Sequence, residues 1–208
     1  MSMSAATFDS GDAAVPRQLR VAESSGGIDL AAAEAAAASL ISALGMDIAD
    51  PSLIRTPRRI AQAYAELLTP REFDLTTFPN DEGYDELVLA RNIPFTSVCE
   101  HHLLPFTGTA AVGYLPGERI LGLSKLARVV DMFARRPQVQ ERMTKQIAGW
   151  LDDHLQARGV GVVLRAEHTC MTLRGVSARG SDTVTSALMG LVRTDERTRA
   201  EFLALAKD

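Results

Sequence analysis

The chain has 208 residues and a formal net charge of -4, and 46% of its residues are hydrophobic, 23% charged and 5% aromatic. This length can bury a core of its own, and the apolar fraction excludes a wholly disordered chain. There is no run of about 20 apolar residues that would suit a membrane helix. The acidic balance argues against a general nucleic-acid coat. We therefore expect neither a membrane nor a nucleic-acid partner.

The N-terminal segment, residues 1–28, is expected to be a disordered leader. It is rich in Ser, Ala, Asp and Gly and lacks the continuous apolar core of a secretory signal. The cytoplasm is therefore the expected compartment. Two cysteines in a chain of this length do not make a disulfide framework, so we expect them to be reduced, metal-bound or inert.

Two helices are predicted next, and they make residues 29–69 a helical region. Asp29 is a plausible N-cap for the alanine-rich segment that ends at Gly45. Thr56 is expected to cap the second helix with Pro57 at its first position, and Pro70 should stop it. The stretch from Pro70 to Tyr84 is rich in turn-forming residues and is expected to be a loop.

Residues 70–208 then alternate between strand and helix patterns. Strands are expected in 86–95, 107–115, 160–175 and 183–193, with a turn at 116–119 before a short strand at 120–123. Ser124 should cap a helix whose apolar face is Leu126, Val129, Val130 and Phe133. Pro137 should open another that Gly159 ends, with a stripe of Met143, Ile147, Trp150, Leu151 and Leu155, and a last helix is expected over 195–207. This order predicts an α+β fold with an antiparallel sheet and helices on one side.

The metal-binding residue types gather in two short segments, CEHH at 99–102 and EHTC at 167–170. Cys99 and His102 are three residues apart, so a turn can aim both at one point. A spacing of two should put His168 and Cys170 on one face of a strand. Two thiolates and one imidazole suit Zn²⁺, so the predicted ligands are Cys99, His102 and Cys170.

The number of ligands decides what such a site does. Three protein ligands leave a position for water, which is the catalytic arrangement, and His101 and His168 would remain beside the metal to move protons. Alternatives stay open on spacing alone. A fourth ligand from His101 or His168 would make the site structural, and isolated cysteines are often inert core residues.

A second group of candidates is suited to an anion. Ser124, Lys125 and Arg128 open a predicted helix, where free backbone N–H groups favour negative charge, and Arg174 follows Cys170 by four residues. Gln140 and Glu141 begin the next helix and are candidates to read the donor edge of a heterocycle. The alternatives are an ordinary solvated helix face and charge compensation at a helix start.

Several of these segments together resemble the signature stretches of the GTP cyclohydrolase I family. They are SVCEHHLLPFTG, GLSKLARVV, RRPQVQERMTKQIA, EHTCMTLRGV and TVTSALMG. The resemblance runs from about Thr56 to Phe202 and leaves out the leader. It implies a zinc-dependent hydrolysis of GTP at C8 to 7,8-dihydroneopterin triphosphate and formate, the first step of folate biosynthesis.

The resemblance also implies an architecture and a set of roles. Residues 70–208 would form a tunnelling-fold domain whose sheets join across subunits into a barrel, in a homodecamer of two pentameric rings. The zinc ligands would be Cys99, His102 and Cys170, and the catalytic histidines His101 and His168. The remaining matches would hold guanine (Gln140 and Glu141) or surround the ribose and triphosphate (Ser124, Lys125, Arg128 and Arg174).

Two other functions remain to be separated from this one. A zinc-stabilised nucleotide-binding module would hold zinc and GTP without turnover. Another enzyme on the same fold, such as a nicotinamide-dependent nitrile reductase, would need a nucleophilic cysteine without the CEHH and EHTC pairing. A zinc nucleobase deaminase is excluded because its H-x-E and P-C-x-x-C arrangement is missing.

Overall fold

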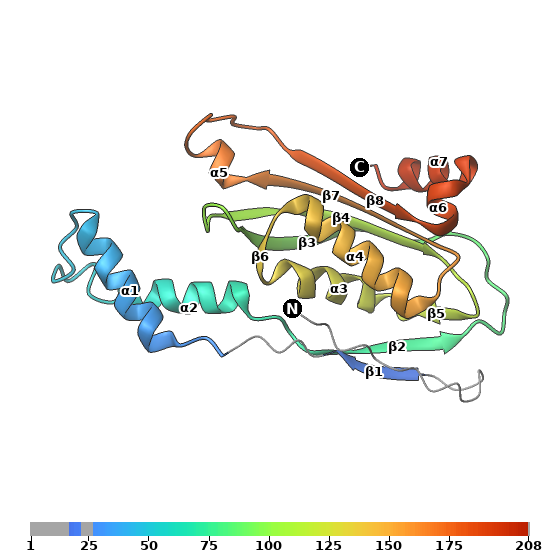
Figure 1. Ribbon diagram of the computed structural model, residues 1–208, viewed down its shortest axis with the longest axis horizontal. Helices are drawn as coiled ribbons and strands as arrows, with labels where there is room; N and C mark the ends of the chain where they lie inside the picture. The colour runs from blue at the N-terminus through green and yellow to red at the C-terminus, as the bar shows by residue number, and fades with distance from the viewer. Residues whose placement is uncertain (1–16, 22–26, 208) are drawn as a thin grey trace.

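The computed structural model describes residues 17–21 and 27–207, and it has two sheets with helices packed around the larger one (Figure 1). The larger sheet has five strands in the order β6-β3-β4-β7-β8, and all its pairings are antiparallel except the short β3–β6 pair. Its strands are β3 (Val88–Cys99), β4 (Pro105–Leu115), β6 (Pro137–Gln138), β7 (Gly159–His168) and β8 (Thr183–Met189). The α+β class expected from the sequence is confirmed.

Two long helices, α3 (Ser124–Ala134) and α4 (Gln140–Leu155), cover one face of this sheet (Figure 1). The predicted apolar positions of both helices are all buried, so the helical periodicity identified the core correctly. They pack against the inward side chains of the strands, including Phe106, Val112, Tyr114, Val162 and Leu164. Burial of this kind stabilises the fold by about 25 cal/mol per Å² of apolar surface.

The helix starts differ from the expectation. Leu123 is the N-cap residue of α3 and no side chain caps it, so Ser124 is the first helical residue instead. Pro137 pairs with β3 as part of β6, and α4 begins only at Gln140. The helix also ends before Gly159, because Gln156 takes the left-handed conformation and Gly159 opens β7. Proline tolerates a strand edge, which is where Pro137 lies.

The opposite face of the sheet carries α7 (Glu196–Leu205), preceded by the short α6 (Gly190–Thr194). The ring of Phe202 is fully buried in a second, smaller cluster with Leu115 and Val192. A β-carbon on Gly161 would lie 2.7 Å from that ring, so only glycine leaves room for it. Helices therefore lie on both faces, and the expectation that they lie on one side is wrong for α7.

The smaller sheet has the order β1-β2-β5 and is antiparallel throughout, with β1 (Arg17–Val21), β2 (Phe73–Pro79) and β5 (Arg119–Leu121). Its central strand lies in the stretch expected to be a loop. That expectation is wrong because Phe73, Leu75 and Thr77 alternate inward and are buried, despite the flanking prolines. Within the expected disordered leader, Arg17–Val21 instead form β1 and pair with β2, and residues 1–16 and 22–26 lie outside the described part.

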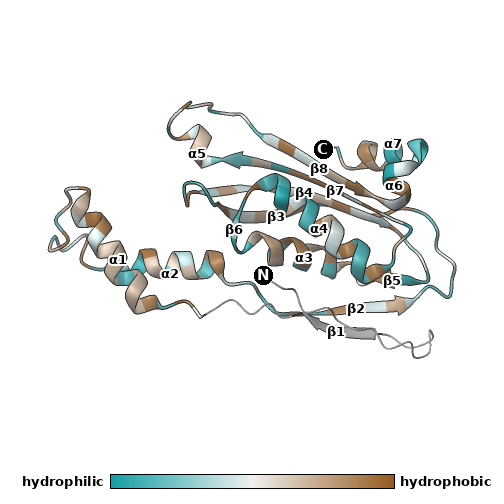
Figure 2. Ribbon diagram, viewed as in Figure 1, coloured by the Kyte–Doolittle hydropathy of each residue, from teal (hydrophilic) through white to brown (hydrophobic). Residues whose placement is uncertain are grey.

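The N-terminal helices α1 (Leu30–Ala43) and α2 (Thr56–Leu68) pack on each other and extend away from the sheets (Figure 1). Asp29 caps α1 as expected, since its carboxylate accepts from Ala32 N–H at 2.9 Å. Thr56 is instead the first residue of α2, after the N-cap Arg55. α1 is apolar along much of its length (Figure 2). Within the described residues, no helix has both the length and the hydropathy to cross a membrane.

Candidate active site

The first candidate segment is a tight loop between β3 and β4. Cys99 ends β3, and its N–H and C=O bond to Leu104 at 2.9 Å and Leu103 at 2.8 Å respectively. Leu103 adopts a left-handed conformation with φ 53°, which is unusual for a side chain of that size. Its carbonyl accepts a hydrogen bond from the Tyr64 hydroxyl of α2 at 2.8 Å. The loop that carries His101 and His102 is thus tied down on both sides.

The second segment does not continue as a strand. β7 ends at His168, and Cys170 lies in a single helical turn, α5 (Thr169–Thr172). The expectation that His168 and Cys170 share a strand face is therefore wrong. The hydroxyl of Thr169 donates to the carbonyl of Pro105 at 2.5 Å, so α5 is anchored to the start of β4. This turn directs Cys170 toward the β3–β4 loop.

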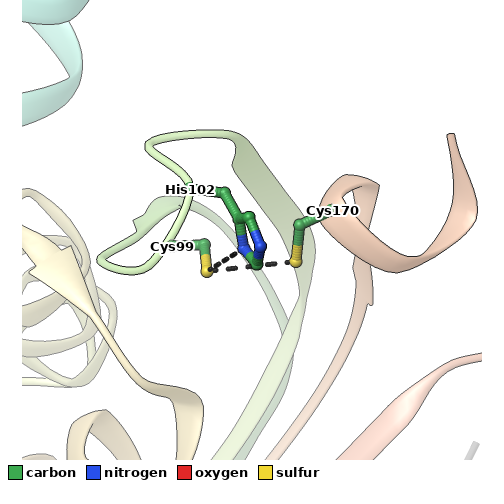
Figure 3. Close-up of side chains that lie close together, drawn as sticks. All are labelled: Cys99, His102 and Cys170. Atoms are coloured by element: carbon green, nitrogen blue, oxygen red, sulfur yellow. Dashed lines mark hydrogen bonds between the residues drawn. The ribbon is translucent and has the colours of Figure 1, made fainter. Parts of the chain in front are cut away.

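The three predicted metal ligands come together (Figure 3). Sγ of Cys99 lies 3.9 Å from Sγ of Cys170 and 3.7 Å from Nδ1 of His102. The ligand atoms of all three residues lie within 4.8 Å of one another. Tetrahedral zinc with bonds of 2.3 Å to sulfur and about 2.05 Å to nitrogen would separate two sulfurs by about 3.8 Å, and sulfur from nitrogen by about 3.6 Å. The donor set and its spacing both fit a zinc ion.

His101 lies beside this cluster but outside it. Its Nδ1 is 4.0 Å from Sγ of Cys99, and its side chain is 64% exposed. Neither His101 nor His168 belongs to the group of three in the described residues, so the structure shows no fourth protein ligand there. Glu100, the residue before His101, forms an ion pair with Arg142, and this contact holds the pKa of the Glu100 carboxyl below its ordinary value. The exposed His101 ring remains accessible to a bound molecule.

The ionisation of Cys170 depends on its surroundings in the cluster. Burial raises the pKa of Cys170 above its ordinary value, and the hydrogen bond and charge of Cys99 raise it further. Arg174 opposes this weakly. With Cys99 beside it, the thiol of Cys170 therefore resists ionisation unless a cation lies close by. A divalent ion would supply the missing positive charge.

His168 is held in a different way. Its ring stacks on Phe106 with centroids 4.4 Å apart and planes 7° apart, and the two residues are register partners on β7 and β4. Its Nε2 lies 2.7 Å from Oε1 of Gln140 at the start of α4. Burial lowers the pKa of His168 below its ordinary value, and the charge of Glu141 raises it in partial compensation. Two contacts therefore orient the His168 ring: Phe106 stacks on one face, and Gln140 bonds to Nε2.

The other predicted site residues are distributed unevenly. Glu141 is exposed and close enough to act on His168 electrostatically, and the exposed Arg174 does the same for Cys170. Ser124, Lys125 and Arg128 lie in the first turns of α3, which follows β5 and leads to β6 beside Cys99. An α-helix of 11 residues is about 16 Å long, so Ser124 lies about that far from the last turn of α3, after which the chain leads to β6.

Three contributors to the site were missed from the sequence. Tyr64 of α2 bonds to the loop that carries the metal ligands, and no local sequence pattern predicts such a contact. Phe106 could have been found only by knowing the β4–β7 register. Thr185 accepts from the Gln140 amide at 3.1 Å, and it comes from the edge strand β8. All three act through pairings between distant segments.

The chain is similar to known proteins over most of its length. The family model described as GTP cyclohydrolase I matches residues 33–207. Among relatives, GTP cyclohydrolase 1 of Rhodopirellula baltica is 48% identical over 183 residues, covering 86% of this chain and 79% of the relative. The Aquifex aeolicus enzyme of that name is 50% identical over 164 residues, covering 79% and 89%. That of Mycobacterium tuberculosis is 51% identical over 178 residues, covering 83% and 88%.

A solved structure of the archaeosine synthase QueF-Like in its apo form is more distant. It is 17% identical with a TM-score of 0.42, and the match covers 50% of this chain and 93% of that one. Similarity at that level does not define the fold. The family model and the relatives at about half identity, however, cover most of the chain, and the range of the family model includes Cys99, His102 and Cys170. The chain is therefore an enzyme of the GTP cyclohydrolase I family.

Proposed function

We propose that this chain hydrolyses GTP at C8 of the purine to give 7,8-dihydroneopterin triphosphate and formate. The observation that carries the proposal is the cluster of Cys99, His102 and Cys170, three ligands in number, with His168 on the adjoining strand. A structural zinc site would close with four protein ligands, whereas three suit hydrolysis. Family membership supplies GTP as the substrate.

Cys99, His102 and Cys170 would hold Zn²⁺. When bound, zinc supplies a Lewis acid that lowers the pKa of a coordinated water to about 7. The thiols must be reduced to serve as ligands, so the cytoplasm is the compartment included in the proposal. The side chains around the cluster would then orient the purine and move protons.

His168 is assigned to the purine and His101 to the sugar. His168, stacked on Phe106, would give a proton to N7, which makes C8 more electrophilic and promotes opening of the ring. Release of formate follows the second hydration of C8. His101, exposed beside the cluster, would transfer protons at the ribose oxygen while the sugar rearranges and recloses as the dihydropterin.

Charged groups would hold the rest of the substrate. The carboxylate of Glu141 would accept from guanine N–H groups, and family resemblance implies a guanine contact for its neighbour Gln140 as well. GTP brings about four negative charges, which Lys125, Arg128 and Arg174 would offset, with Ser124 donating a hydroxyl. This pocket of cations in an acidic chain would favour binding of the triphosphate.

We include assembly in the proposal because Ser124, Lys125 and Arg128 lie in the first turns of α3, and it is the chain after the other end of this helix that pairs with Cys99. The first turn of α3 lies about 16 Å from its last turn, after which the chain enters β6 beside Cys99. A second copy that placed its own α3 near the cluster would complete the site. β8 lies at the edge of the five-stranded sheet, where strands can pair with another chain. The proposed assembly is a homodecamer of two pentameric rings, in which the sheets of residues 70–208 close into a barrel. The edge strand β8 would pair with the next subunit there, and residues 29–69 would form a separate helical region.

The test is incubation of the reduced, zinc-loaded protein with GTP. We expect formate release and the absorbance of a dihydropterin, both lost with a chelator and restored by zinc. A zinc-stabilised binding module would retain GTP without releasing formate, and that outcome would refute the proposal.

The role of His168 is tested by substitution. His168→Ala should keep its zinc and lose formate release by about 10²–10⁴-fold, which is the usual contribution of a proton-transfer group. The matched control is His154→Ala, since His154 stacks on Trp150 away from the cluster and should leave the rate unchanged. Normal turnover by His168→Ala would show that its assigned role is wrong.

A further inference from the structure

The side chain of Gln140 is almost fully buried, and every polar atom of its amide has a partner. It is 1% exposed. Its Nε2 donates toward the carbonyl oxygens of Thr183 at 2.9 Å and Leu164 at 3.2 Å, and toward the hydroxyl of Thr185 at 3.1 Å. Its Oε1 faces Nε2 of His168 at 2.7 Å. A buried amide so occupied has little capacity left for a ligand.

The orientation of this amide is decided by its surroundings. A backbone carbonyl only accepts hydrogen bonds, so the group that faces Thr183 and Leu164 must be the NH₂. A flipped amide would place its oxygen against two carbonyl oxygens and leave all three without a donor, which is costly in a buried place. Oε1 therefore has to point toward His168.

Two threonine hydroxyls make this arrangement self-consistent. The Thr144 hydroxyl has its one proton engaged, because it donates to the carbonyl oxygen of Gln140 at 2.7 Å. The Thr185 hydroxyl, 2.6 Å from that of Thr144, must then donate to it. Thr185 consequently accepts from Gln140, which again requires the NH₂ on that side. Each hydrogen bond in this series can therefore have only one donor: Gln140 donates to Thr185, Thr185 to Thr144, and Thr144 to the backbone carbonyl of Gln140.

The state of the histidine follows from the direction of that chain. Oε1 of Gln140 only accepts, so Nε2 of His168 must carry a hydrogen. In the neutral ring Nδ1 is then the unprotonated nitrogen. The stack on Phe106 sets the plane of the ring and the Gln140 contact sets its rotation within that plane. Tautomer and orientation are both specified by protein groups.

We propose that Gln140 is a positioning residue that fixes His168 as the Nε2–H tautomer and leaves Nδ1 as the nitrogen that exchanges a proton with the substrate. Within the proposed function, on which this inference rests, the unprotonated Nδ1 would first take up a proton from solvent and then give that proton to N7 of the purine. The amide of Gln140 would then act through His168 and would not bind guanine itself. This differs from the role that family resemblance implies for Gln140, and the two roles predict different kinetics.

The tautomer can be read directly in the zinc-loaded, assembled protein. The chain has four histidines, so selective ¹⁵N-histidine labelling gives few imidazole signals in solid-state NMR. The His168 signals are those lost in His168→Ala. At about pH 8, where an ordinary imidazole is neutral, we expect Nε2 protonated and Nδ1 unprotonated. An Nδ1–H tautomer would overturn the inference, and this reading does not depend on turnover of GTP.

Kinetics of Gln140→Leu separate the two roles. Loss of the oriented amide should lower kcat by about 10–100-fold, as for other residues that orient a reacting group, with KM within threefold of the parent value. The same variant should show a mixture of His168 tautomers. A rise in KM of tenfold or more with kcat retained would mean that Gln140 contacts the substrate, and would overturn the inference, as would unchanged kinetics.

Two further variants distinguish a loss of His168 orientation from a general loss of folding stability. Gln62→Leu changes an exposed glutamine on α2 and should leave kcat, KM and the tautomer unchanged. Thr185→Val removes one acceptor of the Gln140 amide and keeps the two carbonyls, so it should lower kcat by a few-fold and broaden the His168 signals. If Gln140→Leu does not fold, the tautomer of the parent protein and Thr185→Val still decide the matter.

Discussion

Strands β4 and β7 pair along their whole length, and their two ends have opposite character. At one end Phe106 is the register partner of His168, next to the ligand loop and α5. At the other end Gly113 is the register partner of Gly161, and both lie under the ring of Phe202. One pair of strands thus carries exposed polar groups at one end and a sealed apolar cluster at the other.

The difference between these two ends indicates that the residues needed for chemistry and those needed for stability lie at opposite ends of the β4–β7 pair. The polar end is held by hydrogen bonds to loops, such as Tyr64 to Leu103 and Thr169 to Pro105. The apolar end is held by packing of α7 on a sheet surface that glycines leave bare. Substitutions at the first end should remove activity from a folded protein, and substitutions at the second should unfold an active one.

The largest effect is expected for Cys170→Ser at the polar end. Changing a hydrogen-bond partner of a metal ligand costs 10–100-fold in affinity, so losing a ligand should cost at least about 100-fold. We expect a folded protein with little zinc, measured by metal analysis, and no formate release. Met171→Ser, a change at its exposed neighbour, should keep both. An active, metal-free Cys170→Ser protein would refute the ligand set.

At the apolar end, Phe202→Ala should destabilise the fold. The ring is fully buried, and removing a buried aromatic side chain costs about 3–5 kcal/mol of unfolding free energy. Denaturant unfolding measures this loss, and formate release per folded molecule should stay within about twofold of the parent rate. The control is Leu203→Ala, an exposed residue of the same helix. Loss of activity without loss of stability would break the separation of the two ends.

A smaller effect at the polar end is expected for Tyr64→Phe. It deletes only the hydroxyl that bonds to the Leu103 carbonyl, and one such bond contributes about 1 kcal/mol, or roughly fivefold in a dissociation constant. Zinc affinity, measured by competition with a chromophoric chelator, should weaken by that factor. Tyr84→Phe in the exposed β2–β3 connection should not change it. Equal affinities for all three proteins would show that the ligand loop needs no tether.

The smallest effect is expected at the cap of α7. Asp195 accepts from Thr198, and these hydrogen bonds lower the pKa of its carboxyl below the ordinary 3.8. Because the folded pKa is the lower one, this contribution to stability is present above about pH 4 and is lost as the pH falls through the folded value. Asp195→Ala should therefore lower the melting temperature at pH 7 by less than Phe202→Ala, and the difference from the parent should shrink in acid. A difference that grows in acid would contradict the cap.

Much of this protein could be predicted from local patterns. The apolar stripe of α3 repeats with the helical period, so Leu126 and Phe133 were placed in the core without any structure. The cluster of ligands was equally predictable, because cysteine and histidine are uncommon in this chain and five of the six lie in two short segments. Residue type and spacing suffice when the chemistry is concentrated in short segments.

Other features depended on segments far apart in the chain. β2 was missed because Pro70, Pro79 and Gly83 suggest a loop, whereas pairing with β5 and burial of Leu75 make a strand. Cys170 was expected on a strand, but β7 stops at His168 where α5 is anchored to β4. All helices were expected on one side of the sheet, but Phe202 of α7 packs over Gly113 and Gly161 on the other face.

The amino-acid sequence by itself determined which residues can bind a metal, which helix faces are buried and which family the chain resembles, since these are properties of residue type and short-range spacing. Only the tertiary structure decided the direction of the Gln140 amide, the tether on Leu103 and the place of Cys170 in a helical turn. Each of those results from contacts between residues distant in the chain, and hydrogen bonds of that kind have no signature in the local sequence.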